Sequence, residues 1–469
     1  MNGYKQIAVD EITKKEELIA DVAGKIWDYA ELSLEEYRSC ELFCKVMAEE
    51  GFEVEKGICG IATAFSASFG AGSPVIGLLA EYDALSGITG DRPSAHGCGH
   101  NLLGAGAMAA AIGIREYLKQ SGRQGTVIFY GCPGEEGCAS KAFMARDGVW
   151  NRLDAALTWH PADCNEVVTG SSNSCIQVKY TFNGVSSHAS AAPDKGRSAL
   201  DAVELMNIGV QFLREHMSPK ERVHYAITDA GGVSPNVVQS RAQVLYMVRS
   251  DRVSKALKLQ ERVDRIAEGA ALMTDTTYER RFVDGMSDTV TNRTLETVAY
   301  KNFEELGVPS HTGEELDKAR ELALTYDSRE NEPGIGAGAD EEYARIAGKL
   351  RSENGTYMND FLLPHFMGDA TCPASTDVGD VSYNCPTLQI HVASWPNGCP
   401  GHSWQNVACA GSTIGFKAAV HAGKVLAATA IDLFEDNELI RKSREEFKSR
   451  TKDGYACPIP EGAKAELSD

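Results

Sequence analysis

The chain has 469 residues, of which 43% are hydrophobic and 24% charged, as in an ordinary soluble globular protein. Its formal net charge of -20 argues against nucleic-acid binding, which needs concentrated lysine and arginine, and gives no support to an acidic membrane surface. A small anionic substrate stays compatible with this charge, because a local cationic pocket can outweigh the overall field.

The sequence shows no targeting or membrane-spanning segment. The N-terminal stretch MNGYKQIAVDEITKKEELIAD is charged and amphipathic, and it lacks the apolar core of a secretory signal. The longest apolar candidate, LLGAGAMAAAIGI, is shorter than the roughly 20 residues that cross a membrane. The 13 cysteines are an odd number outside any repeating framework, which is typical of reduced thiols. We therefore expect a cytoplasmic protein that contacts no membrane.

The first part of the chain alternates helices with buried strands. Apolar residues recur at helical spacing in some segments, whereas others are continuous apolar runs bounded by turn residues. Helices are predicted over residues 14–32, 39–51, 102–122 and 140–150, and strands over 73–85, 125–133 and 153–161. Strands alternating with helices indicate an α/β layer with a mainly parallel sheet.

The pattern changes near residue 174. Apolar and polar residues now alternate within strands, and the elements follow the order β-α-β-β-α-β of a split βαβ sandwich. Strands are predicted over 175–184, 222–232, 241–250 and 277–286, and helices over 197–217 and 254–275. We interpret residues 174–288 as an inserted α+β domain.

The chain then returns to the first domain. Residues 292–307 and 411–434 read as helices and 386–394 as a buried strand, whereas 309–375 are polar and receive no assignment. A length of 469 residues exceeds what one hydrophobic core usually serves. We therefore expect a discontinuous catalytic domain of residues 1–173 and 289–469, interrupted by the domain of 174–288.

Metal-binding residue types follow several of the predicted strands. Open α/β sheets bind ligands beyond the carboxyl ends of their strands. Four separate connections deliver such residues to that edge: Cys98 and His100 in HGCGHN, Glu135 and Glu136 in GEEG, His160 in TWHP, and His402 in PGHSW. A thiolate, imidazoles and carboxylates suit zinc, or manganese where oxygen ligands dominate. The sequence therefore predicts a metal site.

The ligand count points to more than one ion. Five side chains exceed one tetrahedral shell, so two ions sharing a bridging ligand, with a water left for chemistry, fit better. These five are Cys98, His100, Glu136, His160 and His402. The adjacent Glu135 can then act as general base on the water.

Each of these residues also has a simpler interpretation. His160 or His402 alone would more often be a hydrogen-bonded core histidine, and an acidic pair alone a solvated helix N-terminus. A cysteine hydrolase, with Cys98 as nucleophile and His96 or His100 as base, is the rival chemistry. It leaves the glutamate pair and the distant histidines unexplained. The convergence of four connections favours the metal site and leaves His96 a structural role.

Several motifs together resemble a known family. They are HGCGHN, GCPGEEG, TWHP, NGVSSHASAAPDKGRSALDAVELMN, DAGGVSPNVVQSRAQVLYMVR, STDVGD and PGHSW. They are similar to the M20 metallopeptidase and amidohydrolase family, in its aminoacylase-like branch, and the similarity runs over nearly the whole chain. The resemblance implies a catalytic domain with a mainly parallel sheet and helices on both faces. An inserted ferredoxin-like lid would also dimerise.

The resemblance also implies roles for single residues of the catalytic domain. Cys98, His100, Glu136, His160 and His402 match the family's metal ligands. Glu135 matches its general base, and Asp83 matches the acid that orients a ligand histidine. In another branch a ligand histidine lies two positions before this aspartate. Here that position is Glu81, a departure that bears on the number of ions.

Three lid residues match family positions that contact substrate. His188 resembles the histidine that reaches across the dimer to polarise the substrate carbonyl. Asn236 and Arg249 resemble residues that hold a substrate carboxylate, a task that suits the planar fork of arginine. Taken without the resemblance, Arg249 would be a strand-surface charge.

The expected activity is a metal-dependent amidohydrolase with one or two Zn²⁺ or Mn²⁺ ions. The resemblance implies an N-acyl amino acid substrate with an acidic C-terminal residue, with p-aminobenzoyl-glutamate favoured. A metallo-dipeptidase or carboxypeptidase of the same fold is the alternative, followed by a catalytically silent binding subunit and the metal-free Cys98 hydrolase. The expected partners are a second copy through the lid or a homologous A-type subunit.

Overall fold

The computed structural model describes residues 3–327 and 341–467. The chain divides into two compact units. Unit 1 comprises residues 1–171, 290–373 and 381–455, and unit 2 comprises 172–289, 374–380 and 456–469.

Unit 1 contains a seven-stranded sheet in the order β1-β2-β6-β3-β7-β15-β8. The strands are β1 (Glu53–Lys56), β2 (Phe65–Ala71), β3 (Val75–Ala80), β6 (Gly125–Gly131), β7 (Ala155–Ala162), β8 (Glu166–Val167) and β15 (Thr387–Ala393). The four central strands β6, β3, β7 and β15 are parallel, whereas β1, β2 and β8 pair antiparallel at the two edges. The mainly parallel sheet predicted from the sequence is confirmed.

The central strands are buried on both faces, which explains their continuous apolar runs. Leu78 and Phe129 face one hydrophobic core, together with helices from both ends of the chain. The adjacent residues Leu79 and Ile128 face a second core, which contains Met144 of helix α5. The helices of unit 1 are α1 (Gly3–Lys14), α2 (Glu16–Tyr29), α3 (Tyr37–Glu49), α4 (His100–Ser121), α5 (Ser140–Arg146), α8 (Arg293–Leu306), α9 (Gly313–Ala323), α10 (Glu341–Glu353), α12 (Trp404–Ala410), α13 (Thr413–Glu435) and α14 (Asn437–Arg450).

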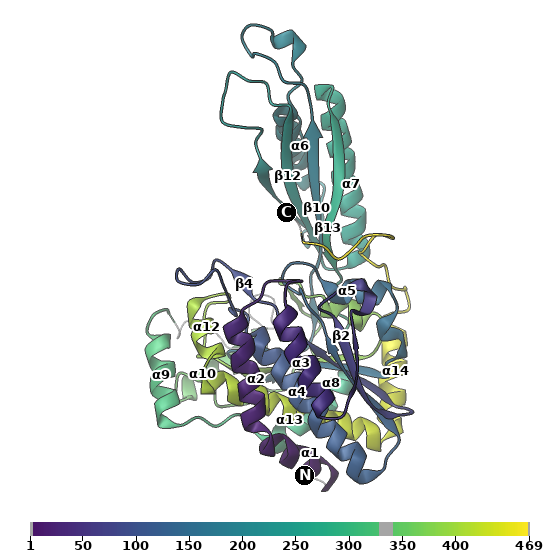
Figure 1. Ribbon diagram of the computed structural model, residues 1–469, viewed down its shortest axis with the longest axis vertical. Coiled ribbons are helices and arrows are strands. Elements are labelled where there is room, and N and C mark those ends of the chain that lie inside the picture. Colours follow the sequence, from purple (N-terminus) through teal and green to yellow (C-terminus); the bar gives the residue numbers. More distant parts are fainter. Residues whose placement is uncertain (1–2, 328–340, 468–469) are drawn as a thin grey trace. The chain divides into compact units, whose positions relative to one another are not determined.

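Two helices rich in small residues, α4 and α13, pack side by side against the sheet (Figure 1). Their close approach is visible at Gly423, where an added Cβ would lie 2.7 Å from Ala109 Cβ. Among the described residues α13 is long and apolar enough to cross a membrane, yet 78% of its most apolar window is buried inside the protein. Its apolar character is explained by this packing.

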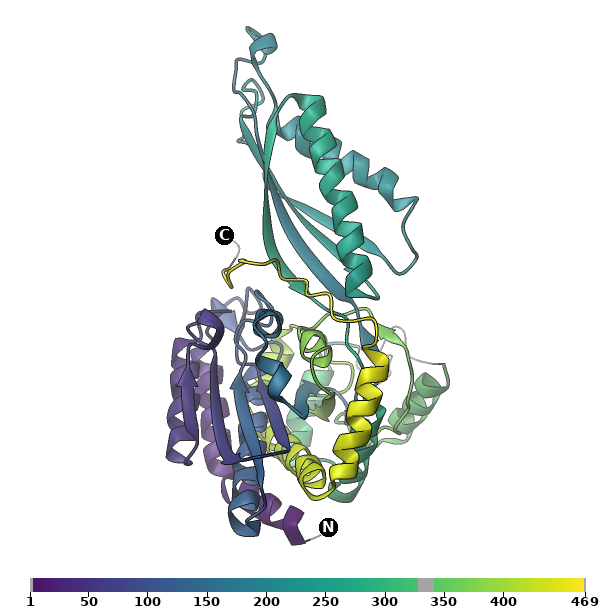
Figure 2. The same cartoon turned by 90° about the vertical axis from the view of Figure 1, so that its right-hand side faces the viewer.

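Unit 2 holds a four-stranded antiparallel sheet in the order β11-β12-β10-β13. The strands are β10 (Ser174–Asn183), β11 (Arg222–Asp229), β12 (Arg241–Ser250) and β13 (Thr277–Met286). The helices α6 (Ala199–Arg214) and α7 (Val253–Thr274) cover one face of this sheet (Figure 2). Along β12, buried residues alternate with partly exposed ones, as in a sheet with one covered face. The predicted β-α-β-β-α-β order is confirmed.

The division of the chain differs from the predicted limits in two segments. Residues 374–380 and 456–469 group with unit 2, although the sequence placed them in the catalytic domain through the range 289–469. The cause is contacts between residues distant in sequence. Ser287 donates its backbone N–H and its hydroxyl to Asp380, at 2.9 and 2.6 Å. Arg281 donates to the carbonyl of Leu467 at 3.1 Å.

Residues 309–375, which received no assignment from the sequence, contain α9, α10 and a two-residue strand, β14 (Thr371–Cys372). Helix α9 begins with a capping box, in which Thr312 and Glu315 each satisfy the other's backbone N–H. Much of the glycine-rich stretch EPGIGAGADEEY falls on residues 328–340, which lie outside the described residues.

Candidate metal centre

The predicted ligands lie at or beyond the carboxyl ends of the central strands. His160 is the third residue from the end of strand β7, and Glu136 lies in the connection from β6 to α5. Cys98 lies in the turn before α4, whose first residue is His100. Gly99 between them has a φ of 73°. A Cβ added at this position would lie 3.1 Å from side-chain atoms of Pro161 and Trp395. Glycine is therefore required for the turn that presents Cys98 and His100 together.

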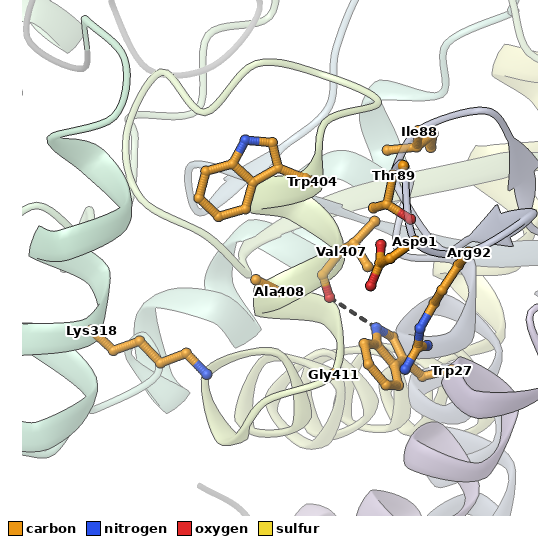
Figure 3. Close-up of a pocket in the computed structure, with 11 residues that line it drawn as sticks. Trp27, Ile88, Thr89, Asp91, Arg92, Lys318, Trp404, Val407, Ala408 and Gly411 are labelled. Atoms are coloured by element: carbon orange, nitrogen blue, oxygen red, sulfur yellow. Dashed lines mark hydrogen bonds between the residues drawn. The ribbon is translucent and has the colours of Figure 1, made fainter.

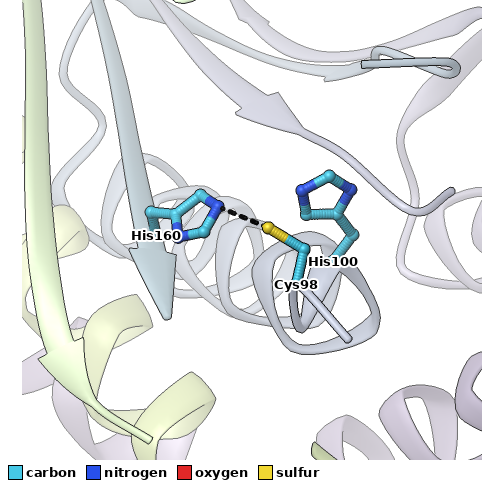
Figure 4. A group of neighbouring side chains, drawn as sticks. All are labelled: Cys98, His100 and His160. Carbon is cyan, nitrogen blue, oxygen red and sulfur yellow. Dashed lines mark hydrogen bonds between the residues drawn. The ribbon is translucent and has the colours of Figure 1, made fainter. Parts of the chain in front are cut away.

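The first group of ligand atoms comes from Cys98, His100 and His160, all within 4.8 Å of one another (Figure 4). Cys98 Sγ lies 3.4 Å from His160 Nε2. The rings of His100 and His160 are nearly perpendicular, with centroids 5.7 Å apart. One ion can be reached by all three side chains.

A second group shares Cys98 with the first. Cys98, Glu136 and His402 also offer ligand atoms within 4.8 Å of one another, and Glu136 Oε1 lies 3.5 Å from His402 Nε2. The structure thus brings all five predicted ligand residues into two groups joined by one thiol. This arrangement could hold two ions with a bridging sulfur ligand.

The chemistry of the donor atoms fits a metal. His100 Nε2 and Glu136 Oε1 are buried, and neither makes a hydrogen bond within the described part of the chain. Leaving such atoms without partners costs roughly 1–3 kcal/mol each, which a coordinated cation would offset.

Contacts at Nδ1 fix the rings of two ligand histidines so that their Nε2 atoms are directed to the site. Asp83 Oδ1 lies 2.8 Å from His100 Nδ1, and Asp83 Oδ2 accepts hydrogen bonds from Ser33 and the Glu136 backbone. His160 Nδ1 donates to the carbonyl of Pro161 at 2.7 Å. With Nδ1–H engaged, Nε2 offers its lone pair, as in most histidine-ligated metal sites.

Burial and charge set the protonation states of these groups. Burial alone would raise the pKa of Asp83, but the charge of His100 and the hydrogen bonds that Asp83 accepts lower this pKa to about 2. Burial lowers the pKa of His160 to about 4, so its imidazole is neutral at pH 7. Burial raises the pKa of the Cys98 thiol to about 12. This thiol therefore becomes a thiolate when a cation displaces its proton.

Glu135 lies in a third group, with Glu81 and His100, whose ligand atoms are also within 4.8 Å of one another. Its carboxylate is therefore close to the metal groups, as a general base requires. His96 belongs to none of these groups, and its Nε2 lies 3.0 Å from the carbonyl of Ile26.

The sequence missed a further set of side chains near this edge. His391 in β15 is the register partner of His160 in β7, and their ring centroids are 6.2 Å apart. Glu166 in β8 lies opposite His391 and contacts its Nδ1 at 2.7 Å, while Tyr343 donates to the other Glu166 oxygen at 2.5 Å. The signal was hidden because His391 lies within the apolar strand LQIHVAS.

A separate pocket is lined mainly by the loop of residues 88–92 and by α12 (Figure 3). Its walls include the indoles of Trp27 and Trp404, and Trp27 Nε1 donates to the carbonyl of Val407 at 2.8 Å. The Arg92 guanidinium lies 4.2 Å from the centroid of the Trp27 ring. None of the five predicted ligands lines this pocket, so it adds nothing to the metal centre.

The three predicted lid residues belong to unit 2. His188 Nδ1 accepts hydrogen bonds from the Ser190 and Ala191 backbones, both at 3.3 Å, and the neighbouring Ala189 N–H donates to the Asn236 carbonyl. Arg249 donates to Ser375 Oγ at 2.8 Å. Asn236 precedes β12, whereas Arg249 lies near its last residue, so a strand of about 30 Å separates them. One copy of the chain does not bring these three residues together.

Comparisons with known proteins agree with this architecture. Residues 171–274 match the family model of the peptidase dimerisation domain of M20 proteins. The chain is 42% identical to the B-type subunit of p-aminobenzoyl-glutamate hydrolase from Escherichia coli, over 96% of each protein. It is 26% identical to the Xaa-Arg dipeptidase of Mus musculus, over 95% of this chain and 92% of the relative.

Solved structures share the fold. An aminobenzoyl-glutamate utilization protein from Klebsiella pneumoniae superposes with a TM-score of 0.58 at 16% identity, over 89% of this chain and 97% of the other. A dinuclear metal-binding peptidase of the M20 family from Bacillus subtilis gives 0.54 at 17% identity, over 90% and 99%.

Proposed function

The chain belongs to the M20 peptidase family and is a hydrolase of amide bonds, and on that premise we propose that it cleaves N-acyl amino acids with an acidic C-terminal residue. The favoured substrate is p-aminobenzoyl-glutamate, because the relative of that name shares 42% of its residues with this chain. The observation that carries the mechanism is the pair of ligand groups joined at Cys98, with Glu135 beside them.

We propose two divalent ions, held by Cys98, His100, Glu136, His160 and His402. A thiol and three imidazoles favour zinc, while the Glu136 carboxylate also suits manganese. When bound, the ions supply a Lewis acid that polarises the amide carbonyl and acidifies a water. The dinuclear M20 peptidase of the same fold supports the count of two.

The side chains divide the remaining work. Glu135 takes a proton from the attacking water and returns it to the departing amine. His188, supplied across a dimer, hydrogen-bonds the developing oxyanion. Arg249 of one copy and Asn236 of the other copy, where it lies beside His188, bind the substrate carboxylate. Ser375 fixes the direction of the Arg249 guanidinium through the bond at 2.8 Å.

The partner and the compartment are part of this proposal. The dimerisation domain supports assembly through unit 2, either with a second copy or with a homologous A-type subunit. A cytoplasmic location is supported by the cysteines, because all 13 lie in the described residues and none is in a disulfide.

The activity test combines metal removal with a change of the base. Chelated protein should lose hydrolysis of p-aminobenzoyl-glutamate and regain it with Zn²⁺ or Mn²⁺. Glu135→Gln should lower kcat by roughly 100-fold or more, while the metal content stays that of the wild type. Glu49→Gln, at an exposed glutamate of α3, is the matched control and should retain full activity. Undiminished activity after complete metal removal would exclude the mechanism.

A dipeptidase activity is the second candidate, because the chain is similar to the Xaa-Arg dipeptidase over 95% of its length. A panel of N-acyl-glutamates, N-acyl-aspartates and dipeptides ending in arginine separates the two. We expect the highest kcat/KM for the N-acyl-glutamates.

A further inference from the structure

A buried ion pair lies at the metal centre and has no role in the proposed mechanism. Glu81 follows β3 directly, and Lys141 belongs to α5. The Glu81 side chain is 4% exposed and that of Lys141 is fully buried, with Lys141 Nζ 2.7 Å from Glu81 Oε1. Removing both charges from water costs several kcal/mol per ion, so the pair calls for an explanation beyond stability.

The second oxygen of Glu81 turns toward the ligands. Glu81 Oε2 lies 3.3 Å from His100 Nε2, the atom that is buried without a hydrogen bond in the described chain. Asp83 Oδ1 lies 2.8 Å from the other ring nitrogen, Nδ1. Nε2 is therefore the atom that His100 can offer to a cation. Glu81, His100 and Glu135 place ligand atoms within 4.8 Å of one another.

We propose that Glu81 is an additional metal ligand and that Lys141 supplies the counter-charge of its carboxylate. This inference rests on the proposed function. Lys141 holds Oε1, so the carboxylate coordinates through Oε2 alone, on the side of His100. Carboxylates that bind a metal are usually hydrogen-bonded to a second group as well, and the Lys141 ammonium is that group for Glu81.

The charges of the site support this division. When ionised, Cys98 and the carboxylates of Glu81, Asp83, Glu135 and Glu136 carry five negative charges close to the ligand groups. Two divalent ions would neutralise four of them, and the buried ammonium of Lys141 neutralises the fifth. Lys141 therefore balances the loaded site, and it also repels the ions that enter it.

The test measures metal binding by the full-length protein. Metal-free protein is titrated with Zn²⁺ against a chromophoric chelator, bound metal is counted after gel filtration, and the Tm is recorded with and without metal. Glu81→Gln should bind one of the ions at least tenfold more weakly. Lys141→Met should bind it more tightly, because a repelling charge is gone, and should lower the Tm of the metal-free protein more than that of the loaded protein.

A second variant guards against misfolding of the first. Replacing one partner of a buried pair strands the other charge, whereas replacing both usually preserves the fold. The double variant Glu81→Gln/Lys141→Met should therefore fold and still bind one ion more weakly than the wild type, though less weakly than Glu81→Gln alone. The control is Asp154→Asn, because Asp154 is a buried carboxylate paired with Arg444 at 2.6 Å outside the ligand groups. It should lower the Tm and leave metal binding unchanged.

A purely structural pair would give a different result. Glu81→Gln, or the double variant if the single one does not fold, would then lower the Tm equally with and without metal and keep wild-type affinity and stoichiometry. That outcome overturns the inference and leaves the proposed function intact. Failure of the wild-type protein itself to bind metal would overturn both.

Discussion

Three histidines at the carboxyl edge of the unit 1 sheet are held in the same way. A hydrogen-bond acceptor engages Nδ1, which fixes the tautomer and the ring direction: Asp83 for His100, the Pro161 carbonyl for His160, and Glu166 for His391. In each case the opposite nitrogen is left for other contacts. The carboxylate is the stronger partner, so His100 is held more firmly than His160.

Asp284, in β13 of unit 2, gives a pH-dependent prediction. Burial, helped by repulsion from Asp377, raises the pKa of this carboxyl from 3.8 to about 6. Between pH 4 and 6 the folded state binds more protons than the unfolded state, so stability falls as pH rises, by up to about 3 kcal/mol. Asp284→Asn should remove this loss and raise the Tm at pH 7.5 while leaving it nearly unchanged below pH 4. Calorimetric scans at both pH values measure the effect.

Asp251 provides the control, because its pKa is shifted in the opposite direction to that of Asp284. Although burial acts to raise its pKa, the hydrogen bond from Lys255 at 2.9 Å and the lysine charges bring the pKa below its ordinary value. Asp251→Asn should therefore lower stability at pH 7.5 relative to acid pH. A Tm of Asp284→Asn that follows the wild type at every pH would contradict the assignment for Asp284.

Single residues were predictable where their motif follows a strand. Cys98, His100, Glu136, His160 and His402 stand out because a parallel sheet collects its strand ends at one edge. Lys141 and His391 did not stand out, since a lysine in a helix and a histidine in an apolar strand fit the surrounding pattern. Only the strand register and the side-chain distances show where these two lie.

Helix α4 links the packing of unit 1 to the metal centre, because its first residue is His100. An added Cβ at Gly106 would lie 2.5 Å from Trp159 Nε1 and 2.9 Å from the Ala419 carbonyl. We expect Gly106→Ala to lower stability by about 1–3 kcal/mol through overpacking, although alanine favours helices by about 1 kcal/mol over glycine. Because α4 must shift, metal affinity should fall as well. Urea unfolding and a zinc titration measure the two effects.

Gly24 in α2 is the matched control. An added Cβ there meets only Phe416 Cζ, at an ordinary contact distance of 3.6 Å. Gly24→Ala should therefore be neutral or stabilising by up to about 1 kcal/mol, with unchanged zinc affinity. Equal stabilities of the two variants would show that α4 and its neighbours can separate without cost.

The elements were predictable where hydrophobic periodicity is strong. The parallel strands, α4, α13 and the β-α-β-β-α-β unit follow from apolar runs and spacing alone. Short edge strands such as β8 and β14, each of two residues, carry too little pattern to be recognised. Neither could the sequence show that residues 374–380 and 456–469 group with unit 2, because hydrogen bonds between distant segments decide this.

Assembly through unit 2 is testable on its exposed apolar residues. Ile208 and Phe212 lie one turn apart on α6 and are 53% and 71% exposed, so α6 carries an apolar stripe on its outer side. A dimer that buries this stripe should elute at twice the chain mass of 50.6 kDa. Phe212→Glu should shift the protein to the monomer mass, because a buried, unpaired carboxylate opposes association. Light scattering coupled to size exclusion reports the mass.

Leu324, in unit 1, is the matched control, because its exposure of 66% is close to that of Phe212. Leu324→Glu adds the same charge at a site outside the dimerisation domain of residues 171–274 and should leave the dimer intact. If His188 acts across the dimer, Phe212→Glu should also lose hydrolysis while keeping its metal. A Phe212→Glu dimer at micromolar concentration would remove α6 from the interface. A monomer with full activity would show that His188 does not act from a second copy of the chain.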